Sequence, residues 1–247
     1  MNDKYEGIIL KQNDYRENDA LISVLFKDLG KYTLSCKGVR KLTSKNSMSV
    51  RPFLTSEFLF DYVETKSMFN LKNATVIKNR KNITENLTKM SLSTLICQIV
   101  DVTHLNDYLD ILDEVFNLLE FCLDKINNEN YEILTSCLFI ASYLDIIGLK
   151  PNVDGCTMCS SSQISGISIT EGGFLCKTHS SNVSTIKDLD LDNLKKFRLI
   201  NKADISNYEV LKNLIDFNMK DLNVLIEFFE YHTGIKLNSS KILNMII

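Results

Sequence analysis

Short runs of apolar residues, several of them alternating with polar ones, follow one another over the first 80 positions of the chain. The runs cover residues 7–10, 20–26, 32–36, 53–63 and 71–77. In the fourth run Phe58, Phe60 and Tyr62 share one side of a pleat, which is the two-residue period of a half-buried strand. Five short strands without room for crossover helices predict a small antiparallel β-barrel, and we expect the five-stranded OB-fold.

After residue 81 the apolar period changes to the spacing of amphipathic helices. Asn82, followed by Glu85, predicts a capping box at the start of a helix that reaches about residue 102. Further helices are expected over residues 105–123, 131–147, 191–200 and 208–231, with a short helix after residue 239. The polar residues 152–183 interrupt this pattern. We therefore expect an α+β protein with an OB-fold domain at residues 1–81 and a helical domain at 82–247 that contains the insert 152–183.

Charge divides the chain in the same way. The formal net charge of the whole chain is −3. Residues 1–82 carry 15 basic and 9 acidic side chains, a net charge of +6, whereas residues 83–247 carry a net charge of −9. Such an asymmetry indicates a segment that binds a polyanion, joined to a part with another role.

Composition narrows the class of protein further. Hydrophobic residues make up 45% of the chain and charged residues 24%, which is typical of a globular protein. No apolar run approaches the ~18 residues of a membrane helix, and the N-terminus lacks the apolar stretch of a secretory signal. We expect a cytoplasmic protein without a membrane partner, whose seven cysteines are reduced thiols.

Three cysteines and a histidine form a motif within the insert. Cys156-Thr-Met-Cys159 is followed, after sixteen residues, by Cys176-Lys-Thr-His179. Two pairs of ligands with two intervening residues each are what tetrahedral zinc requires, because a tight turn lets both side chains of a pair reach one ion. Three thiolates and one imidazole leave no coordination position for water. The pattern therefore predicts a structural zinc ion bound by Cys156, Cys159, Cys176 and His179.

Two other interpretations of this motif stay open at this point. The residues could be buried free thiols beside a surface histidine, or Cys156 and Cys159 could be a redox pair. A redox pair is expected after a strand in a βαβ unit, and no such pattern precedes Cys156. The other four cysteines lie among apolar residues, where small core side chains are expected; they are Cys36, Cys97, Cys122 and Cys137.

A cationic stretch without any acidic residue runs through the end of the third predicted strand and the loop after it. Its basic residues are Lys31, Lys37, Arg40, Lys41, Lys45 and Arg51. OB-folds bind the phosphate backbone of nucleic acids with such cations beside the barrel, so these six are the candidate contacts. Further cations would extend the basic surface towards the helices, at Lys78, Arg80 and Lys81. The alternative is a solvated lysine loop without a ligand.

Aromatic side chains near the cations could stack on bases, although most are expected in the core of the barrel. They are Tyr15, Tyr32, Phe53, Tyr62 and Phe69. Signatures of catalysis are missing from the sequence: there is no P-loop, no G-x-G-x-x-G, no G-x-S-x-G and no H-E-x-x-H. The H-x-E of zinc deaminases is also missing. We therefore expect neither an enzyme nor a small-molecule substrate.

The order of these motifs resembles that of RecO, a family of bacterial DNA-repair proteins and recombination mediators. The opening Gly7-Ile-Ile-Leu10, then Tyr15-Arg-Glu-Asn-Asp19-Ala-Leu-Ile, Gly30-Lys31 and Lys37-Gly-Val-Arg-Lys41 are similar to the signature of its barrel. The Cys156, Cys159, Cys176 and His179 motif is similar to the zinc motif of many members, and Gly234-Ile-Lys-Leu-Asn-Ser-Ser-Lys-Ile-Leu243 is similar to the closing helix of the family. Many relatives carry Cys in place of His179, and some lack the ligands altogether.

The resemblance implies a function for each part of the chain. RecO proteins bind single- and double-stranded DNA through the OB-fold and anneal complementary strands, and with RecR they help to load RecA onto strands coated by single-strand binding protein. By position, the resemblance supports Lys31, Lys37, Arg40, Lys41 and Lys45 as DNA contacts. Glu17 and Asp19 are expected to be structural, because carboxylates would oppose DNA binding. The competing hypothesis is a zinc-stabilised protein-interaction scaffold that does not contact DNA.

Overall fold

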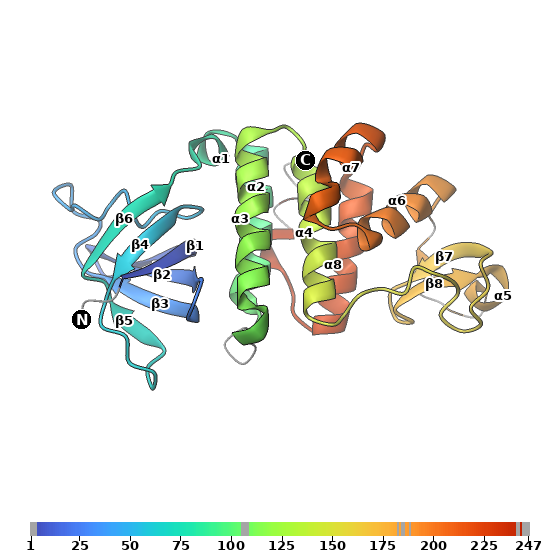
Figure 1. Cartoon of the computed structure of the whole chain (residues 1–247), viewed down its shortest axis with the longest axis horizontal. Coiled ribbons are helices and arrows are strands. Elements are labelled where there is room, and N and C mark those ends of the chain that lie inside the picture. The colour runs from blue at the N-terminus through green and yellow to red at the C-terminus, as the bar shows by residue number, and fades with distance from the viewer. Residues whose placement is uncertain are drawn as a thin grey trace. The chain divides into compact units, whose positions relative to one another are not determined.

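The structure is a computed structural model that describes residues 4–104, 109–181, 183, 186, 187, 189–240 and 243. The chain forms two compact units, which divide between Glu129 and Asn130 (Figure 1). The first three α-helices belong to the same unit as the N-terminal strands. The change from strands to helices near residue 81 therefore lies inside the first unit.

A six-stranded mixed sheet forms the N-terminal part of the first unit. Its strands are β1 (Lys4–Tyr15), β2 (Asp19–Phe26), β3 (Gly30–Cys36), β4 (Thr55–Leu59), β5 (Met68–Asn70) and β6 (Asn73–Lys78). Their order across the sheet is β5-β3-β2-β1-β4-β6. All described pairs are antiparallel except β3 with β5, which is parallel.

The sheet is strongly curled but is not a closed barrel. β5 and β6 lie on opposite edges in the strand order, yet only Leu71 and Lys72 separate them, so the Cα atoms of Asn70 and Asn73 are three residue steps and at most about 11 Å apart. The Leu71 N–H donates to Ser35 O at 3.0 Å, and the Lys72 N–H donates to Leu59 O at 2.9 Å. No ladder joins β5 to β6 within the described residues. The expected β domain is confirmed, but it has six strands in a mixed sheet where five antiparallel strands were predicted.

The interior of the curl is apolar. Residues from all six strands and from the β3–β4 loop bury side chains in one cluster, including Ile22, Val24, Phe26, Leu34, Phe58, Phe60 and Phe69. Phe58 and Phe60 are buried and Tyr62 is half-buried against them, as the alternation in this segment predicts. The Phe26 and Phe58 rings meet edge to face, with centroids 5.6 Å apart. This core fixes the sheet from which the β3–β4 loop projects.

The helices of the first unit begin differently from the sequence-based prediction. They are α1 (Lys81–Glu85), α2 (Leu87–Val102), the 3₁₀ turn Leu109–Ile111 and α3 (Leu112–Asn128). The predicted capping box at Asn82 was wrong, because Asn82 lies inside α1 and its amide donates to Asn127 O. Asn86 ends α1 and caps α2, where its side chain accepts from the Lys89 N–H at 3.0 Å. The start expected near residue 105 lies outside the described residues.

The second unit is a helical domain with a small sheet. Its helices are α4 (Glu132–Ile146), α5 (Lys177–Ser180), α6 (Leu191–Lys202), the 3₁₀ turn Ile205–Asn207, α7 (Tyr208–Leu214) and α8 (Met219–Thr233). The single helix predicted over 208–231 is interrupted at 215–218, and Asn218 with Asp221 forms a capping box for α8. Most of the segment after residue 240 lies outside the described residues. None of the described helices has the length and apolar composition needed to cross a membrane.

The small sheet belongs to the insert. It consists of β7 (Ile164–Ser168), β8 (Gly173–Cys176) and β9 (Ile186–Lys187), in the order β8-β7-β9, and both pairs are antiparallel. Besides buried Val153, Ile167, Ile169 and Phe174, the insert has a cluster of three buried residues, Cys156, Leu175 and Cys176, with Ile164 and Val183 half-buried against them. Two of the three buried residues are thus members of the cysteine motif. So small a cluster leaves much of the stabilisation around the cysteines to other interactions.

Candidate metal centre and nucleic-acid interface

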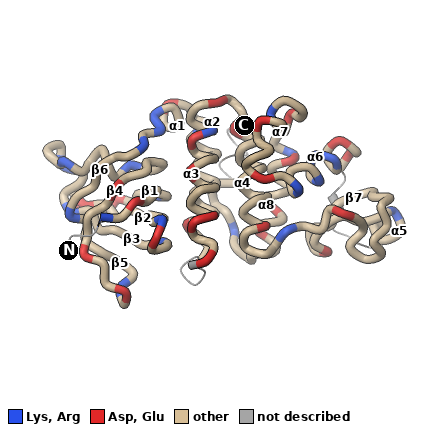
Figure 2. Tube along the Cα trace, viewed as in Figure 1, with Lys and Arg blue, Asp and Glu red and all other residues tan. Residues whose placement is uncertain are grey.

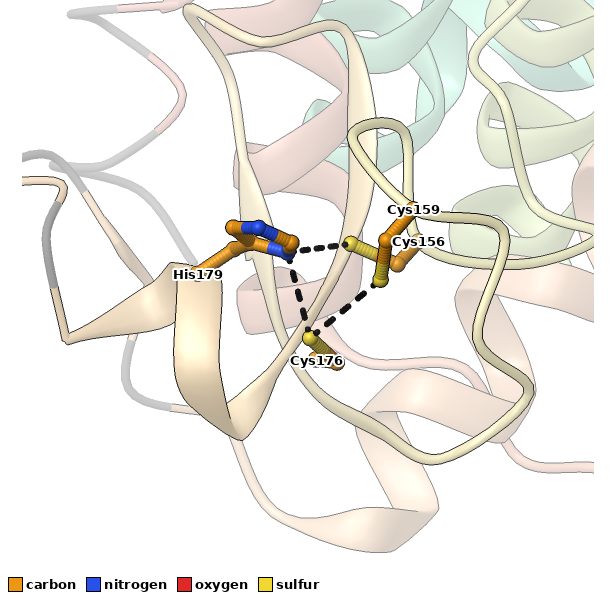
Figure 3. A group of neighbouring side chains, drawn as sticks. All are labelled: Cys156, Cys159, Cys176 and His179. Atoms are coloured by element: carbon orange, nitrogen blue, oxygen red, sulfur yellow. Dashed lines mark hydrogen bonds between the residues drawn. The ribbon is translucent and has the colours of Figure 1, made fainter.

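Tight turns bring the four residues of the Cys/His motif together at one end of the β7–β8 hairpin, where the start of β7 lies opposite the end of β8 (Figure 3). Cys156 and Cys159 lie on a turn in which the Ser160 N–H donates to Cys156 O at 2.8 Å and the Cys156 N–H donates to Ser161 O at 2.9 Å. A Cβ at Gly155 would lie 2.9 Å from Ser160 O, so this turn depends on glycine. Cys176 ends β8, and His179 follows on α5.

The four side chains converge on one point. Their Sγ and Nδ1 or Nε2 atoms all lie within 4.8 Å of one another. Cys156 Sγ is 3.4 Å and Cys176 Sγ is 3.3 Å from His179 Nδ1, and Cys159 Sγ is 3.8 Å from Cys176 Sγ (Figure 3). The cluster could hold a metal ion. Convergence of all four atoms argues against the interpretation as unrelated buried thiols.

The pKa shifts in the cluster differ among its cysteines: the pKa is lowered at Cys156 and Cys176 and raised at Cys159. Desolvation raises the pKa of Cys156, but backbone N–H groups and the His179 ring outweigh it and lower that pKa to about 6. The backbone of His179 is the largest influence on Cys176 and lowers the pKa of its thiol. Hydrogen bonds with Cys156 and Cys176 raise the pKa of His179. Thiolate, not thiol, is the form that binds metal, so the shifts at Cys156 and Cys176 favour ligation, whereas those at Cys159 and His179 favour the protonated forms.

The remaining four cysteines have the opposite environment. Cys36, Cys97, Cys122 and Cys137 are all buried. Desolvation raises the pKa of Cys36 to about 12 and that of Cys97 to about 12, and it also raises the pKa of Cys122 and Cys137. These thiols are protonated and unreactive at neutral pH, which confirms the expectation of small core side chains.

The second candidate region is the cationic loop, which we define as residues 37–51 between β3 and β4. Its backbone is held at both ends. Val39 and Val50 are buried in the core of the sheet, and Asp19 Oδ1 accepts a 2.7 Å hydrogen bond from the Gly38 N–H. Further along, the Ala74 N–H donates to Asn46 Oδ1 at 3.2 Å. The expectation that Asp19 is structural is thus matched by its contact with this loop.

Most of the predicted DNA contacts project from the cationic loop into solvent. Lys37, Arg40, Lys41, Lys45 and Arg51 are all exposed. Arg40 forms an exposed ion pair with Asp14 at 3.1 Å. Within the described part of the chain, the other four form no salt bridge, so their charge is available to a polyanion. These five cations lie on one loop of the first unit, and Figure 2 shows red Asp and Glu segments along α3.

Lys31 does not join this group. Its side chain is half-buried, and its Nζ donates to the backbone carbonyls of Asp101 and Thr103 at the end of α2. Desolvation lowers the pKa of Lys31, and the Asp101 carboxylate opposes that effect. Lys31 therefore ties β3 to α2, and we do not assign it a phosphate contact from this geometry.

The expected extension of the basic surface through Lys78 and Arg80 was wrong. The Arg80 side chain is 1% exposed, and its Nε donates to Asp124 Oδ1 at 2.6 Å. Its Nη1 donates to Phe53 O at 2.8 Å, which holds the carbonyl of a residue with φ of +69°. Lys78 pairs with Glu120 at 2.9 Å. These two cations fasten the sheet to α3 and are not available to a ligand; Lys81 pairs with Glu85 on the surface.

The aromatic candidates for stacking on bases also divide into side chains packed in the sheet domain and one that is exposed. Phe53 and Phe69 are buried, and Tyr32 packs edge to face on Phe69 with ring centroids 5.4 Å apart. The Tyr32 and Tyr62 hydroxyls are 3.3 Å apart. Tyr15, which is 42% exposed at the end of β1, is therefore the candidate that remains for stacking on a base.

The structure also shows a cleft that the sequence did not indicate. It has a volume of about 430 Å³ and lies on the outer face of β1, β2 and β3 beside the end of α2. Polar side chains that line it include Lys11, Asn13, Ser23, Lys31 and Asp101. Lys11 is exposed in this cleft, but nothing in the local sequence distinguishes it from the other lysines of the N-terminal strands. Only the bulge in β1 and the packing of α2 bring it beside Asp101.

Fold and sites together define a class: a curled β-sheet domain with a cationic loop, joined to a helical domain with a Cys₃His cluster. Comparison with known families agrees with that class. Residues 1–80 match the family described as "Recombination protein O N terminal", and residues 84–241 match "Recombination protein O C terminal". Because these matches cover nearly all of the sequence, the chain belongs to the RecO family.

Individual relatives agree with this assignment. The chain is 23% identical to the DNA repair protein RecO of Exiguobacterium sibiricum, over 100% of this chain and 98% of that protein. It is 24% identical to the protein of the same name from Bacillus pumilus, over 98% and 93% of the two chains. It is 25% identical to that of Caldanaerobacter subterraneus, over 85% and 83%. The similarity thus extends through both units.

Proposed function

We propose that this protein is a DNA-binding recombination mediator in the cytoplasm. It anneals complementary single strands and, with RecR, helps to load RecA onto strands coated by single-strand binding protein. The observation that carries the proposal is the cationic loop, whose exposed cations include four without salt bridges in the described residues. Membership of a family of DNA-repair proteins supports the same function. The phosphate contacts are Lys37, Arg40, Lys41, Lys45 and Arg51.

Annealing requires the neutralisation of phosphate charge and no covalent reaction. Two complementary strands repel each other through their phosphates, and cations that neutralise both backbones let the bases meet. The ordered backbone of the cationic loop presents its cations in one place, which lowers the entropy lost on binding. No bond is made or broken in this reaction, so the proposed role is that of a mediator and not of an enzyme.

The metal in the Cys/His cluster is, we infer, a structural zinc ion. Two zinc–sulfur bonds of about 2.3 Å at the tetrahedral angle separate their sulfurs by about 3.8 Å, and a sulfur–nitrogen pair is separated by about 3.5 Å. The Cys159 and Cys176 sulfurs are 3.8 Å apart, the Cys156 and Cys176 sulfurs are 3.4 and 3.3 Å from His179 Nδ1, and all ligand atoms lie within 4.8 Å of one another. Cys156, Cys159, Cys176 and His179 would fill the coordination shell. The zinc ion supplies cohesion at a place where the apolar cluster around the cysteines is small.

Annealing of complementary oligonucleotides, one with a fluorophore and one with a quencher, tests the function. The full-length protein is compared with the charge-reversed variant Lys41→Glu/Lys45→Glu and with the matched variant Lys195→Glu/Lys220→Glu, which changes exposed lysines of the second unit. We expect the wild-type protein to accelerate annealing, the loop variant to lose at least about 90% of the acceleration, and the matched variant to retain most of it. Equal loss in both variants would contradict the assignment of the loop.

The competing scaffold function makes a different prediction in the same experiment. A scaffold without DNA contact would leave annealing at its spontaneous rate while still binding a peptide with the acidic tail of single-strand binding protein. Exposed apolar residues on the helices of the second unit, such as Leu191 at 71% and Leu214 at 72%, offer surface for such contacts. A wild-type protein that binds the peptide and does not anneal DNA would establish the scaffold.

A further inference from the structure

The cationic loop also carries an exposed apolar side chain, Leu42, which the proposed phosphate contacts do not explain. The side chain of Leu42 is fully exposed, at 106%, and no other large apolar residue in the described ranges reaches this value. Leu214 and Leu191 follow at 72% and 71%. Single exposed leucines are common on protein surfaces, so exposure alone carries no argument. The argument comes from how the loop holds Leu42 and from the residues on either side.

The backbone around Leu42 is ordered by consecutive turns. Gly38 has a φ of +62°, and the Lys41 N–H donates to Gly38 O at 3.1 Å. The next turn encloses Leu42 directly, because the Ser44 N–H donates to Lys41 O at 3.0 Å. Buried Val39 lies three residues before Leu42 and anchors the loop in the core of the sheet. Leu42 is thus displayed by a fixed backbone and does not fold back onto the sheet.

The neighbours of Leu42 limit what it can contact. Lys41 and Thr43 on either side are polar and exposed, and Lys45 lies three residues further on. A single aliphatic side chain between cations buries too little apolar area to anchor a protein on a lipid surface, which takes a broader apolar face. A nucleic acid offers a complementary ligand: phosphates for the lysines and the apolar face of a base for the leucine.

We propose that Leu42 is a wedge that packs against an unstacked base while Lys41 and Lys45 hold the adjacent phosphates. This inference rests on the proposed DNA-binding function and adds a step to it. Stacked bases in a single strand must separate before they can pair with a partner, and apolar side chains placed between bases separate them. Leu42 would keep bases of the bound strand apart and ready to pair.

A single strand that contains 2-aminopurine provides the test, because this base becomes brighter when it is unstacked. We expect the full-length wild-type protein to raise its fluorescence on binding. Leu42→Ala should reduce that rise at least about threefold while changing the affinity less than about threefold and leaving the salt dependence of binding unchanged. Leu42→Met should restore the rise, and Leu214→Ala, which removes an exposed leucine of the second unit, should behave as wild type.

The outcomes separate the inference from the function on which it rests. If Leu42→Ala binds DNA and gives the full fluorescence rise, the wedge is wrong and the DNA-binding function stands. If the wild-type protein does not bind the strand at all, both are wrong. A Leu42→Ala variant that keeps the full rise but no longer binds phosphatidylcholine–phosphatidylserine vesicles would assign Leu42 to a membrane. Since Leu42 is fully exposed, thermal unfolding should be the same in wild type and variant.

Discussion

The cationic loop and the insert at residues 152–183 solve the same structural problem in opposite ways. Both contain stretches of chain without a large apolar core of their own. The cationic loop fastens its backbone to the sheet through buried Val39 and Val50, which leaves its charged side chains free to face solvent. The insert turns its polar side chains inward, so that Cys156 and Cys176 are themselves part of its core. The loop is anchored by two apolar side chains and keeps its charged side chains for a partner in solution, whereas the insert uses its cysteine side chains within its own core.

Removal of one ligand from the insert should have the largest effect. Cys176→Ala is expected to lose the metal, because three ligands leave the coordination shell open. Structural zinc contributes about 10–16 kcal/mol of apparent binding energy in finger peptides, so the insert should unfold with its loss. Metal analysis should find one zinc ion per wild-type chain and none in the variant, and limited proteolysis should cut the variant within 152–183.

A cysteine outside the cluster provides the control for that experiment. Cys97→Ala also removes a buried thiol, but from α2, and it should keep the full zinc content. His179→Cys should keep the metal as well, because four thiolates close a tetrahedral shell. Purified wild-type protein without zinc, or Cys176→Ala with a full equivalent, would show that the insert is not ordered by its metal.

Two cations of the first unit extend the comparison from segments to single residues. Arg80→Met should lower the free energy of unfolding by about 3 kcal/mol, since it leaves Asp124 without its buried partner and Phe53 O without a donor. The loss is at the low end of the range for buried pairs because Lys78 still contacts Glu120 and Asp124. Lys41→Met should change the free energy of unfolding by less than about 0.5 kcal/mol. Urea unfolding measures both, and similar values would refute the distinction between a structural and a displayed cation.

The backbone anchors of the cationic loop should have a smaller effect on stability. Asp19→Ala removes the acceptor of the Gly38 N–H and should cost about 1 kcal/mol. The Gly38 amide should then exchange its hydrogen faster. Glu17→Ala, which changes an exposed carboxylate two residues earlier, should leave both the exchange rate and the melting temperature unchanged. If the two variants exchange alike, the loop is not held through Asp19.

The sequence alone predicted the features that local patterns encode. The four cluster residues lie on two close pairs, and the turn at Cys156–Cys159 is a local property of Gly155 and its neighbours. The β domain, the helical domain and the alternation through Phe58 and Phe60 are likewise local periodicities. Comparison with known families agrees with the RecO resemblance that these motifs carried.

Features that depend on distant partners were not accessible in the same way. β5 has only three residues and is a strand because it pairs with β3, more than thirty residues earlier. The sequence predicts Arg80 as a surface cation, but in the structure it is buried and pairs with Asp124 on α3. The sequence predicts Asn82 as a helix cap, yet its side-chain amide donates to Asn127 O, and Asn86 is the residue that caps α2. In each case a contact between segments far apart in sequence outweighs the local signal.

The salt dependence of single-strand binding tests the central claim most directly, namely that the cations of the loop neutralise phosphates. The slope of log affinity against log salt is about −0.7 for each phosphate neutralised. The neutral variant Lys41→Gln/Lys45→Gln should therefore have a slope that is shallower by about 1.4 than wild type, and Lys195→Gln/Lys220→Gln should keep the wild-type slope. An unchanged slope in the loop variant would show that the DNA, if it binds, binds elsewhere.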